Sequence, residues 1–396
     1  MVEWKRMWEV TTWDKKFSGV DKLMQPTVLK YHYYLANELA ELERPNGDIR
    51  ILYTTDKEAF VDSDDVEGNI SEGEVVTIPW GGNVNIQYYK GRFVTADNRI
   101  ATSNNVDYLC NKYLYYWMLS QKEEIGMFYR GAGIKHPSML SVLTMLVPIP
   151  SISEQQRIVD ILDTFTSSIE NLKEQIALRR KQYEYYRDQL LDIEGKDGVE
   201  WKSIDEIKRS LKTGLNPRQN FKLNTSTAEF PYITGKDIYN NQINISDNTD
   251  KIDAAAISII NKRACLEKGL LLFASTGCGT VGRMAIIKDY NHDWAISETL
   301  YAIKFISDIL PDYVMQCLYA NYIKKQYEPK ISRGSVPHLK VADLLKVNIP
   351  IPSIIEQQRI VSILDTFEAS IANLEAQLAQ REKQYEYYRN KLLTFE

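Results

Sequence analysis

The chain contains nearly the same 45-residue segment twice. The first copy, residues 147–191, reads VPIPSISEQQRIVDILDTFTSSIENLKEQIALRRKQYEYYRDQLL, and the second, residues 349–393, matches it at 32 of 45 positions with a constant offset of 202 residues. A weaker echo, VEWK, stands at residues 2–5 and again at 199–202. The two stretches of about 145 residues between these repeats do not resemble each other. A chain built in this way keeps one scaffold and carries two different globular parts, called here the first and the second reader.

Each copy of the segment predicts a long helix. A pair of prolines holds its first residues extended, and a serine followed three residues later by glutamate then predicts a capping box. These residues are Pro148, Pro150, Ser151 and Glu154 in the first copy and Pro350, Pro352, Ser353 and Glu356 in the second. About forty residues without proline or glycine follow. At the usual rise per residue, such a helix is roughly 60 Å long.

Apolar residues in both copies recur at alternating spacings of four and three, with an arginine at the same place in each. Five heptads of this kind are typical of a coiled-coil seam. The seam comprises Ile158, Leu162, Phe165, Ile169, Leu172, Ile176, Arg179, Tyr183, Tyr186 and Leu190, and in the second copy Ile360, Leu364, Phe367, Ile371, Leu374, Leu378, Arg381, Tyr385, Tyr388 and Leu392. The two arginines either select the register or extend their charged ends to solvent at the edge of the seam.

The two seams are expected to pack on each other. The second reader must return the chain, which favours an antiparallel pair of helices with approximate two-fold symmetry. The alternative is two separate amphipathic helices, each packed on its own domain.

The last turns of both helices carry the sequence KQYEYYR. Two of the three tyrosines fall on the seam, and the third, Tyr185 or Tyr387, faces elsewhere. Tyrosine beside arginine is typical of protein interfaces, so Tyr185, Arg187, Tyr387 and Arg389 are predicted to bind a partner. Surface tyrosines without a partner are the alternative.

The first reader predicts a mixture of strands and helices. A β-branched run at residues 74–79 leads into a turn at 80–83, and helical spacing follows over 108–121. A loop with glycine and histidine, RGAGIKH, closes this part at residues 130–136.

The second reader follows a similar order. Strands are expected at residues 230–238, 268–275 and 283–287, and a helix at 312–327. Its closing loop is SRGSVPH at residues 332–338, and the offset of 202 residues aligns His136 with His338. Both readers are therefore predicted to share an α+β architecture.

The charge balance restricts how such a chain can bind nucleic acid. The net charge is −5 overall, −4 over residues 1–147 and +4 over residues 199–349. Neither reader has the broad basic excess of a protein that binds DNA unaided, so a DNA-binding chain of this kind would need a partner to supply much of the backbone contact. Ordinary surface charge is equally consistent with these counts.

Other features of the composition favour a reduced, cytoplasmic setting without a membrane. The four cysteines form no CxxC motif, which argues against a zinc site or a disulfide framework. The N-terminus has no signal-peptide core, and no apolar run approaches the length of a membrane helix.

The whole chain resembles the specificity subunit of a type I restriction-modification system. The resemblance is carried by the two helical repeats, with PIPSxxEQQRIVxILD and KQYEYYR. Looser reader motifs are residues 10–17 with Gly81 and Gly82, and residues 212–217 with 233–238. The resemblance implies two target-recognition domains at 1–147 and 199–348, a central conserved helix and linker at 148–198, and a C-terminal conserved helix at 349–396.

The same resemblance implies a function and partners. Each target-recognition domain would read one half of a bipartite double-stranded DNA target, and the helices would set the spacing and dock two methyltransferase subunits. Nuclease/translocase subunits would join this core. S-adenosylmethionine, ATP and magnesium are expected on those partners, and no cofactor is expected on this chain.

Apparent catalytic motifs are better explained by structure. The glycines of GCGTVG at residues 277–282 precede a strand, which indicates a hairpin and not a dinucleotide site. Asp312 with Glu328 imitates a nuclease motif, but Asp312 begins a predicted helix. The proline–proline–aromatic loop expected of a base-flipping methyltransferase is absent from the sequence, and the four histidines are isolated. The chain is therefore predicted to be a non-catalytic subunit.

Polar loop residues that suit base edges and phosphates are the predicted DNA contacts. They are Thr55, Lys57, Trp80, Asn83, Asn85, Arg130, Lys135 and His136 in the first reader, and Lys212, Asn216, Arg218, Thr234, Lys236, Thr276, Arg283, Arg333, Ser335 and His338 in the second. Two other functions stay open at this point. A self-contained nuclease or methyltransferase would show activity as the purified chain, and a coiled-coil adaptor with two protein-binding modules would show no sequence preference on DNA.

Overall fold

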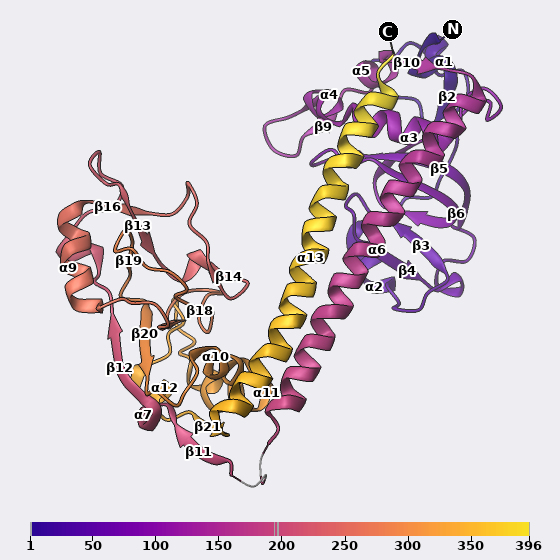
Figure 1. Cartoon of the computed structure of the whole chain (residues 1–396). Helices are drawn as coiled ribbons and strands as arrows, with labels where there is room; N and C mark the ends of the chain where they lie inside the picture. Colours follow the sequence, from indigo (N-terminus) through magenta and orange to yellow (C-terminus); the bar gives the residue numbers. More distant parts are fainter. Residues whose placement is uncertain (1, 194, 196–197, 396) are drawn as a thin grey trace. The chain divides into compact units, whose positions relative to one another are not determined.

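The computed structural model describes residues 2–193, 195 and 198–395, which form two compact units (Figure 1). The first unit comprises residues 1–173 and 376–396, and the second comprises residues 174–375. Two helices of 40 residues each, α6 (Ile152–Leu191) and α13 (Ile354–Leu393), are shared between the units. Each unit therefore contains one reader, the beginning of one long helix and the end of the other.

The first reader is built on a six-stranded sheet with the order β2-β7-β5-β6-β3-β4. Strands β3 and β6 are parallel, and the other described pairs of this sheet are antiparallel. Its centre is rich in β-branched and aromatic residues, which favour strands. The bounds are β2 (Thr11–Trp13), β3 (Ile49–Leu52), β4 (Glu58–Val61), β5 (Ser71–Pro79), β6 (Gln87–Thr95) and β7 (Asn98–Ser103).

Helix α3 (Asn111–Ser120) covers this sheet and buries Tyr113, Leu114 and Trp117. The predicted helix of the first reader is thus confirmed. The remaining short elements are β1 (Glu3–Arg6), α1 (Met7–Val10), η1 (Lys22–Met24), α2 (Ala36–Leu42), η2 (Ser63–Val66), α4 (Lys122–Met127), β8 (Tyr129–Arg130), β9 (His136–Pro137), α5 (Met139–Thr144) and β10 (Leu146–Ile149).

The second reader has a four-stranded antiparallel sheet with the order β12-β20-β17-β18, beside a three-stranded sheet with the order β16-β13-β19. Its strands are β11 (Glu200–Ser203), β12 (Lys208–Thr213), β13 (Phe230–Ile233), β14 (Ile238–Tyr239), β15 (Gln242–Ile243), β16 (Lys251–Ile252), β17 (Leu271–Ala274), β18 (Met284–Ile286), β19 (Ala295–Ile296), β20 (Leu300–Phe305) and β21 (Asn348–Ile351).

Helix α10 (Pro311–Tyr319) packs on the four-stranded sheet as α3 does in the first unit, and it continues after Ala320 as α11 (Asn321–Tyr327). The other helical elements are α7 (Ile204–Ile207), α8 (Pro217–Asn220), η3 (Gly235–Asp237), α9 (Ala254–Ala264), η4 (Glu328–Lys330) and α12 (Val341–Leu345). Both readers are α+β, as predicted. None of the helices in the described part of the chain is long and apolar enough to cross a membrane.

The short VEWK echo has a structural role in each unit. Strand β1 pairs antiparallel with β10, and Trp4 faces Pro148. Strand β11 pairs in the same way with β21, and Trp201 faces Pro350. The echo therefore forms the strand that holds the proline segment leading into each long helix.

A buried glutamine fixes the first turn of each long helix to its reader. The side chain of Gln155 accepts a hydrogen bond from the backbone of Cys110 at 2.9 Å and donates to the carbonyl of Tyr108 at 2.9 Å. Gln357 makes the equivalent bonds to the backbone of Leu310 and Asp308, each at 3.0 Å. Because both glutamines are fully buried, these bonds define one depth and one rotation for the helix on either reader.

The predicted capping serine is present in both copies. The hydroxyl of Ser151 accepts from the N–H of Glu154 at 3.3 Å, and Ser353 does the same for Glu356. The carboxylates of the two glutamates bind Arg157 and Arg359, one turn further along.

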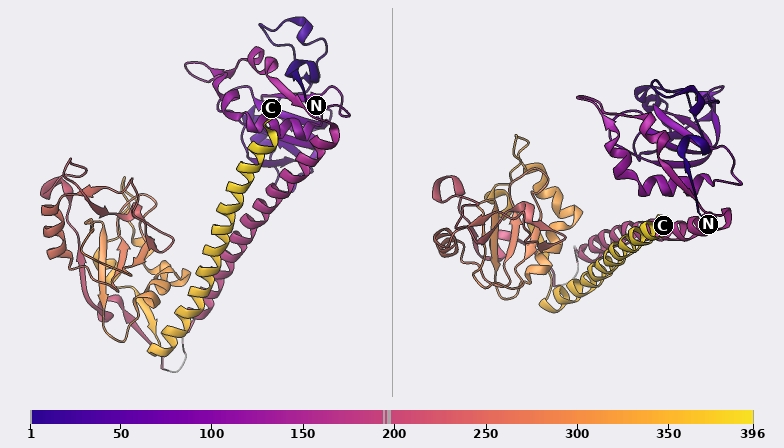
Figure 2. Two further views of the ribbon diagram at one scale, coloured as in Figure 1. Left: turned by 45° about the horizontal axis from the view of Figure 1, so that its top comes forward. Right: turned by 90° about the horizontal axis from the view of Figure 1, so that it is seen from above.

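The two long helices lie side by side within each unit, also in the turned views of Figure 2. In the first unit, the rings of Phe165 and Tyr388 stack at 5.3 Å, and Lys173 pairs with Glu382 at 3.5 Å. In the second unit, Tyr186 stacks on Phe367 at 5.4 Å, and Arg180 pairs with Glu375 at 2.5 Å. In each unit the partner's number falls as the residue number in α6 rises, so the two segments run in opposite directions.

One charged contact of this packing differs between the units. In the first unit, Lys112 on α3 pairs with Asp163 on α6 at 2.7 Å. In the second unit, Asp312 and Asp365 occupy the equivalent positions on α10 and α13. Partial burial and the neighbouring Glu368 carboxylate raise the pKa of both aspartates, and the Asp312 charge adds to the rise in the pKa of Asp365, while Lys288 opposes it.

Substitution of Asp312 with lysine should therefore stabilise the second unit, by about 0.5–1 kcal/mol at neutral pH for a partly exposed pair. A carboxylate whose pKa is raised by folding destabilises the fold as pH rises through that pKa, so the gain should be largest at pH 7 and should shrink once acid protonates Asp365. Hydrogen exchange of the α10 amides, converted to opening free energies at pH 5 and pH 7, measures the effect. Asp247→Lys, at an exposed site of the same unit, is the control. An equal gain in both variants would contradict the pairing.

Candidate nucleic-acid interface

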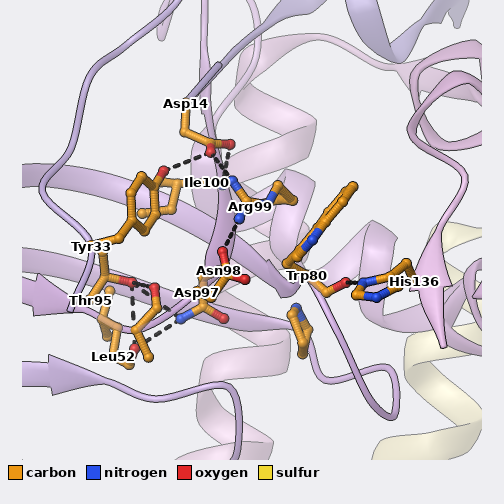
Figure 3. Close-up of polar contacts among 12 residues, drawn as sticks. Asp14, Tyr33, Leu52, Trp80, Thr95, Asp97, Asn98, Arg99, Ile100 and His136 are labelled. Atoms are coloured by element: carbon orange, nitrogen blue, oxygen red, sulfur yellow. Dashed lines mark hydrogen bonds and ion pairs between the residues drawn. The ribbon is translucent and has the colours of Figure 1, made fainter. Parts of the chain in front are cut away.

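A buried ion pair lies at the edge of the first reader's sheet (Figure 3). Arg99 on β7 and Asp14, directly after β2, are both fully buried and 2.6 Å apart. The other oxygen of Asp14 accepts from the N–H of Ile100 at 2.9 Å, and Tyr33 donates to the carboxylate at 2.6 Å. Burial and the Asp14 charge raise the pKa of Tyr33 well above its ordinary value, which keeps its hydroxyl protonated as a donor. These contacts therefore hold the three side chains in one orientation.

The ion pair positions the Trp80 ring and the Asp97 carboxylate, which both reach the surface. The guanidinium of Arg99 lies over the Trp80 ring at 4.9 Å and over the Tyr33 ring at 5.3 Å. Its second nitrogen binds the carboxylate of Asp97, whose side chain is 61% exposed. Asn98 locks the turn between β6 and β7 by donating to the carbonyl of Leu52 at 2.8 Å (Figure 3). Arg99 itself does not reach solvent, so it is a positioning residue.

Two loops meet at Trp80. His136 Nδ1 lies 2.7 Å from the carbonyl oxygen of Trp80, and the two rings are 5.2 Å apart. The ammonium of Lys15 also lies over the Trp80 ring, 5.3 Å from its centre. A Cβ on Gly81 would meet Ile134 at 2.9 Å, so the close approach of the two loops requires glycine there. The site thus gathers Lys15 and His136 at Trp80, and Arg99 lies between that ring and the exposed carboxylate of Asp97.

The second reader has a groove at the corresponding edge of its sheet, with a volume of about 420 Å³. Thr276, two residues after β17, contacts His338 Nδ1 at 2.8 Å, and the backbone N–H of Gly277 donates to the carbonyl of Pro337 at 3.0 Å. Glu298 accepts from Asn216 at 3.0 Å and from Tyr232 at 3.1 Å. Lys236 pairs with Asp250 at 2.7 Å, and this contact helps to hold the pKa of Asp250 below its usual value although partial burial opposes the shift.

The glycines at 277–282 connect the antiparallel strands β17 and β18, so the predicted hairpin is confirmed. Asp312 lies in the first turn of α10 and Glu328 begins η4, which follows α11, as expected for structural residues. Within residues 2–193, 195 and 198–395, no group of three histidine, cysteine or acidic side chains has the geometry to hold a metal ion.

The two readers place similar groups at the same end of the sheet. In each, a residue just after a central strand contacts the histidine of the closing loop: Trp80 contacts His136 through its backbone carbonyl, and Thr276 contacts His338 through its hydroxyl. In each, a carboxylate stands just before the neighbouring strand, Asp97 one residue before β7 and Glu298 two residues before β20.

The structure brings some of the predicted first-reader contacts together at this site and separates others. Trp80, Asn83, Arg130, Lys135 and His136 lie on the two loops that meet at Trp80. Thr55 and Lys57 lie in the turn between β3 and β4, where Lys57 pairs with Glu43, and Asn85 donates to that turn at Thr54 at 3.4 Å.

Of the contacts predicted in the second reader, Thr234, Lys236 and Thr276 line the groove. Asn216, Ser335 and His338 contact its lining residues. Lys212 is exposed on β12, Arg218 on α8 and Arg333 on the closing loop. The guanidinium of Arg283 binds the backbone carbonyls of Gly279 and Ile238, each at 3.1 Å, which is a structural use of this side chain.

The sequence prediction missed Asp14, Tyr33, Asp97 and Arg99 in the first reader and Glu298 in the second. The arginine in the otherwise apolar and small-residue strand NRIATS was a usable signal, because a charged residue in a central strand needs a buried partner. Asp14 lies 85 residues away in sequence.

The predicted partner contacts on the helix tails divide into two kinds. Tyr185 and Tyr387 are exposed, at 61% and 59%. Arg187 is buried in the second unit with its guanidinium over Tyr183, so it offers almost no surface to a partner, contrary to the prediction for this residue. Arg389 is half-buried in the first unit and lies over Tyr385.

Comparison with protein families matches most of the chain. Residues 33–179 and 196–382 each match the type I restriction modification DNA specificity domain. The chain belongs to this family. The specificity subunit of an Escherichia coli type I restriction enzyme is 30% identical over 307 residues, which cover 72% of this chain and 70% of that protein. A protein classed as a type I restriction enzyme specificity subunit in Haemophilus influenzae is 30% identical over 360 residues, 84% of this chain and 86% of that protein.

Solved structures show the same fold. The S subunit of a type I restriction-modification system from M. genitalium has a TM-score of 0.61 and 16% identity, and the match covers 100% of this chain and 97% of that one. A chain from a structural study of complex assembly in a type I system has a TM-score of 0.55 and 16% identity, covering 99% and 97%. The predicted family, and the predicted function as a DNA-recognition subunit, are confirmed. In this specificity subunit, the sites around Trp80 and Thr276 lie inside the two matched domains.

Removal of Arg99 should destabilise the first unit of the subunit strongly. Arg99→Ala leaves the carboxylate of Asp14 buried without its cation, a change that costs about 3–5 kcal/mol. Arg130→Ala, which removes an exposed arginine of the same reader, should cost less than about 0.5 kcal/mol. Hydrogen exchange of the β5 and β7 amides measures both. Equal protection in the two variants would show that the ion pair is not what holds this edge of the sheet.

Proposed function

We propose that this specificity subunit reads a bipartite double-stranded DNA target, with each reader contacting one half through the site described above. The observation that carries this proposal is that two readers of unlike sequence place a closing-loop histidine and a carboxylate at the same end of equivalent strands. A shared geometry suits a common ligand, the DNA duplex, and unlike side chains suit two different base sequences.

The charges around the two sites suit recognition of base edges better than strong binding of DNA without a partner. Lys15, Arg130 and Lys135 surround the first site, and Lys236 and Arg333 are near the second, and all five side chains are exposed. The subunit as a whole has a net charge of −5. Most of the nonspecific attraction to phosphates must therefore come from other chains of the complex.

The two long helices form, in this proposal, an antiparallel coiled coil with approximate two-fold symmetry that spaces the two readers. The support is the heptad pattern in both copies and the opposite direction of the helix segments within each unit. The half-buried guanidinium of Arg381, which lies over Phe165 at 5.7 Å, favours packing at the edge of the seam for this arginine.

The partners are two methyltransferase subunits, which dock on the helices, and nuclease/translocase subunits. S-adenosylmethionine, ATP and magnesium belong to those subunits, and this chain takes no part in bond breaking. Family membership supports these assignments, together with the structural roles of the glycine hairpin and Asp312. The site of action is the cytoplasm, where such a complex meets the cell's DNA.

Substitutions in the two closing loops should act on separate halves of the target. Arg130→Ala with Lys135→Ala should relax sequence discrimination in one half only, because these exposed residues belong to the first reader. Arg333→Ala with Ser335→Ala, the matched change in the second reader, should relax the other half. A good base contact is worth about 1–3 kcal/mol. Methylation-site sequencing with the assembled complexes decides, and equal relaxation of both halves by either pair would refute separate reading.

Tyr185→Ala with Tyr387→Ala should weaken binding of the methyltransferase subunits while both helices stay folded, because each tyrosine points away from the packed face. Glu184→Ala with Glu386→Ala, at the adjacent exposed positions, is the control. Co-purification and titration of the methyltransferase subunit measure the effect. Unchanged affinity of the tyrosine variant would place the docking surface elsewhere on the subunit.

A further inference from the structure

A carboxylate lies just before the equivalent strand of the sheet in both sites. The strand β7 lies between β2 and β5 in the first reader, and β20 lies between β12 and β17 in the second. Asp97 directly precedes β7, and Glu298 stands two residues before β20. The N–H of Trp80 donates to the Asp97 carbonyl at 2.9 Å, and that of Ser275 donates to the Thr299 carbonyl at 2.8 Å, so Glu298 lies one residue before the counterpart of Asp97.

Both carboxylates are held in place without losing all of their acceptor capacity. Asp97 binds Arg99 through Oδ1 and is otherwise exposed. Glu298 accepts one bond at each oxygen, from Asn216 and Tyr232, and is half-buried at the wall of the groove. An ionised carboxylate offers about four lone-pair directions, so each side chain retains free directions for a further donor.

A fixed carboxylate on a DNA-reading surface is repelled by phosphates and gains only from a hydrogen-bond donor on a base edge. In the major groove, those donors are the exocyclic amino groups of adenine and cytosine. We propose that Asp97 and Glu298 are specificity-determining residues, each accepting a hydrogen bond from the amino group of an adenine or a cytosine in its own half of the target. This inference rests on the proposed function and adds the base-edge group, an exocyclic amino group, that each site selects at one place in the groove.

If a carboxylate reads a base, its removal should lower discrimination and raise affinity for DNA. Asp97→Ala removes a negative charge from the surface that faces DNA, so affinity for DNA of any sequence should rise. Discrimination at one position of the first half-site should fall about tenfold or more, the loss expected for one base contact. Glu298→Gln leaves Asn216 and Tyr232 with a partner and should relax one position of the second half-site alone.

The experiment uses the subunit assembled with its methyltransferase subunits. Methylation-site sequencing gives discrimination at every position, and titration of duplexes with a matched or an altered base gives affinity. Asp64→Ala, an exposed carboxylate of the first reader in η2, is the matched control and should alter no position. For each variant, the half read by the unchanged reader reports whether the complex has assembled and folded.

Two outcomes overturn the inference. Asp97→Ala could raise affinity with every position still discriminated, which would make Asp97 a bystander. It could relax the whole first half together with loss of β7 amide protection, which would make Asp97 only a positioning residue for Arg99. If the unaltered complex shows no bipartite target at all, the proposed function fails instead.

Discussion

The rest of the structure depends on one apolar contact. In each reader, the helix that covers the sheet, α3 or α10, packs against the first turns of the long helix that follows it. Ile158 and Leu162 enter the core of the first reader beside Tyr113, and Ile360 and Leu364 enter that of the second beside Tyr313. The hydroxyls of the two tyrosines donate to Pro148 and Pro350, at 2.9 and 2.8 Å. The tail of the other helix completes each core, through Leu393 in the first unit and Leu191 in the second. Both long helices use the same repeated residues to pack on their readers. A reader therefore needs to preserve only this contact surface, and the remainder of its sequence is free to differ.

The elements that follow from local pattern were predictable from the sequence. The seam spacing located helices that begin at Ile152 and Ile354, and the β-branched run before Trp80 located β5. The parallel pairing of β3 with β6 was not predictable in this way, because it joins residues more than forty positions apart and leaves no periodic trace. The burial of Arg187 has the same origin: the tail sequence shows an arginine among tyrosines, but its environment comes from the second reader, including Tyr319 and Tyr327.

The candidate sites were predictable in part for a related reason. Some site residues lie at strand ends and in loops, where the sequence shows a turn with polar residues: Trp80, His136, Thr276 and His338. Asp97, Arg99 and Asp14 form one cluster only after β2 and β7 pair, so no stretch of sequence shows that the aspartates and the arginine share a site. What the sequence did show was a charged residue in an apolar strand. A buried arginine without partners would cost far more than a strand can supply, so its presence already implied a buried anion nearby.

In the proposed function, this arrangement lets a subunit with net negative charge discriminate between DNA sequences. An exposed lysine or arginine that contacts a base loses side-chain entropy on binding, and that loss reduces the free energy available for recognition. The groups around Arg99 have already lost that freedom during folding, since Tyr33, Trp80 and Asp14 fix the guanidinium from three sides. The buried pair of Asp14 and Arg99 adds no net charge, so it contributes orientation without contributing nonspecific attraction to phosphates. In the proposed function, discrimination between bases depends on the geometry of the surface that this pair supports, while other subunits supply the attraction that brings DNA to the complex.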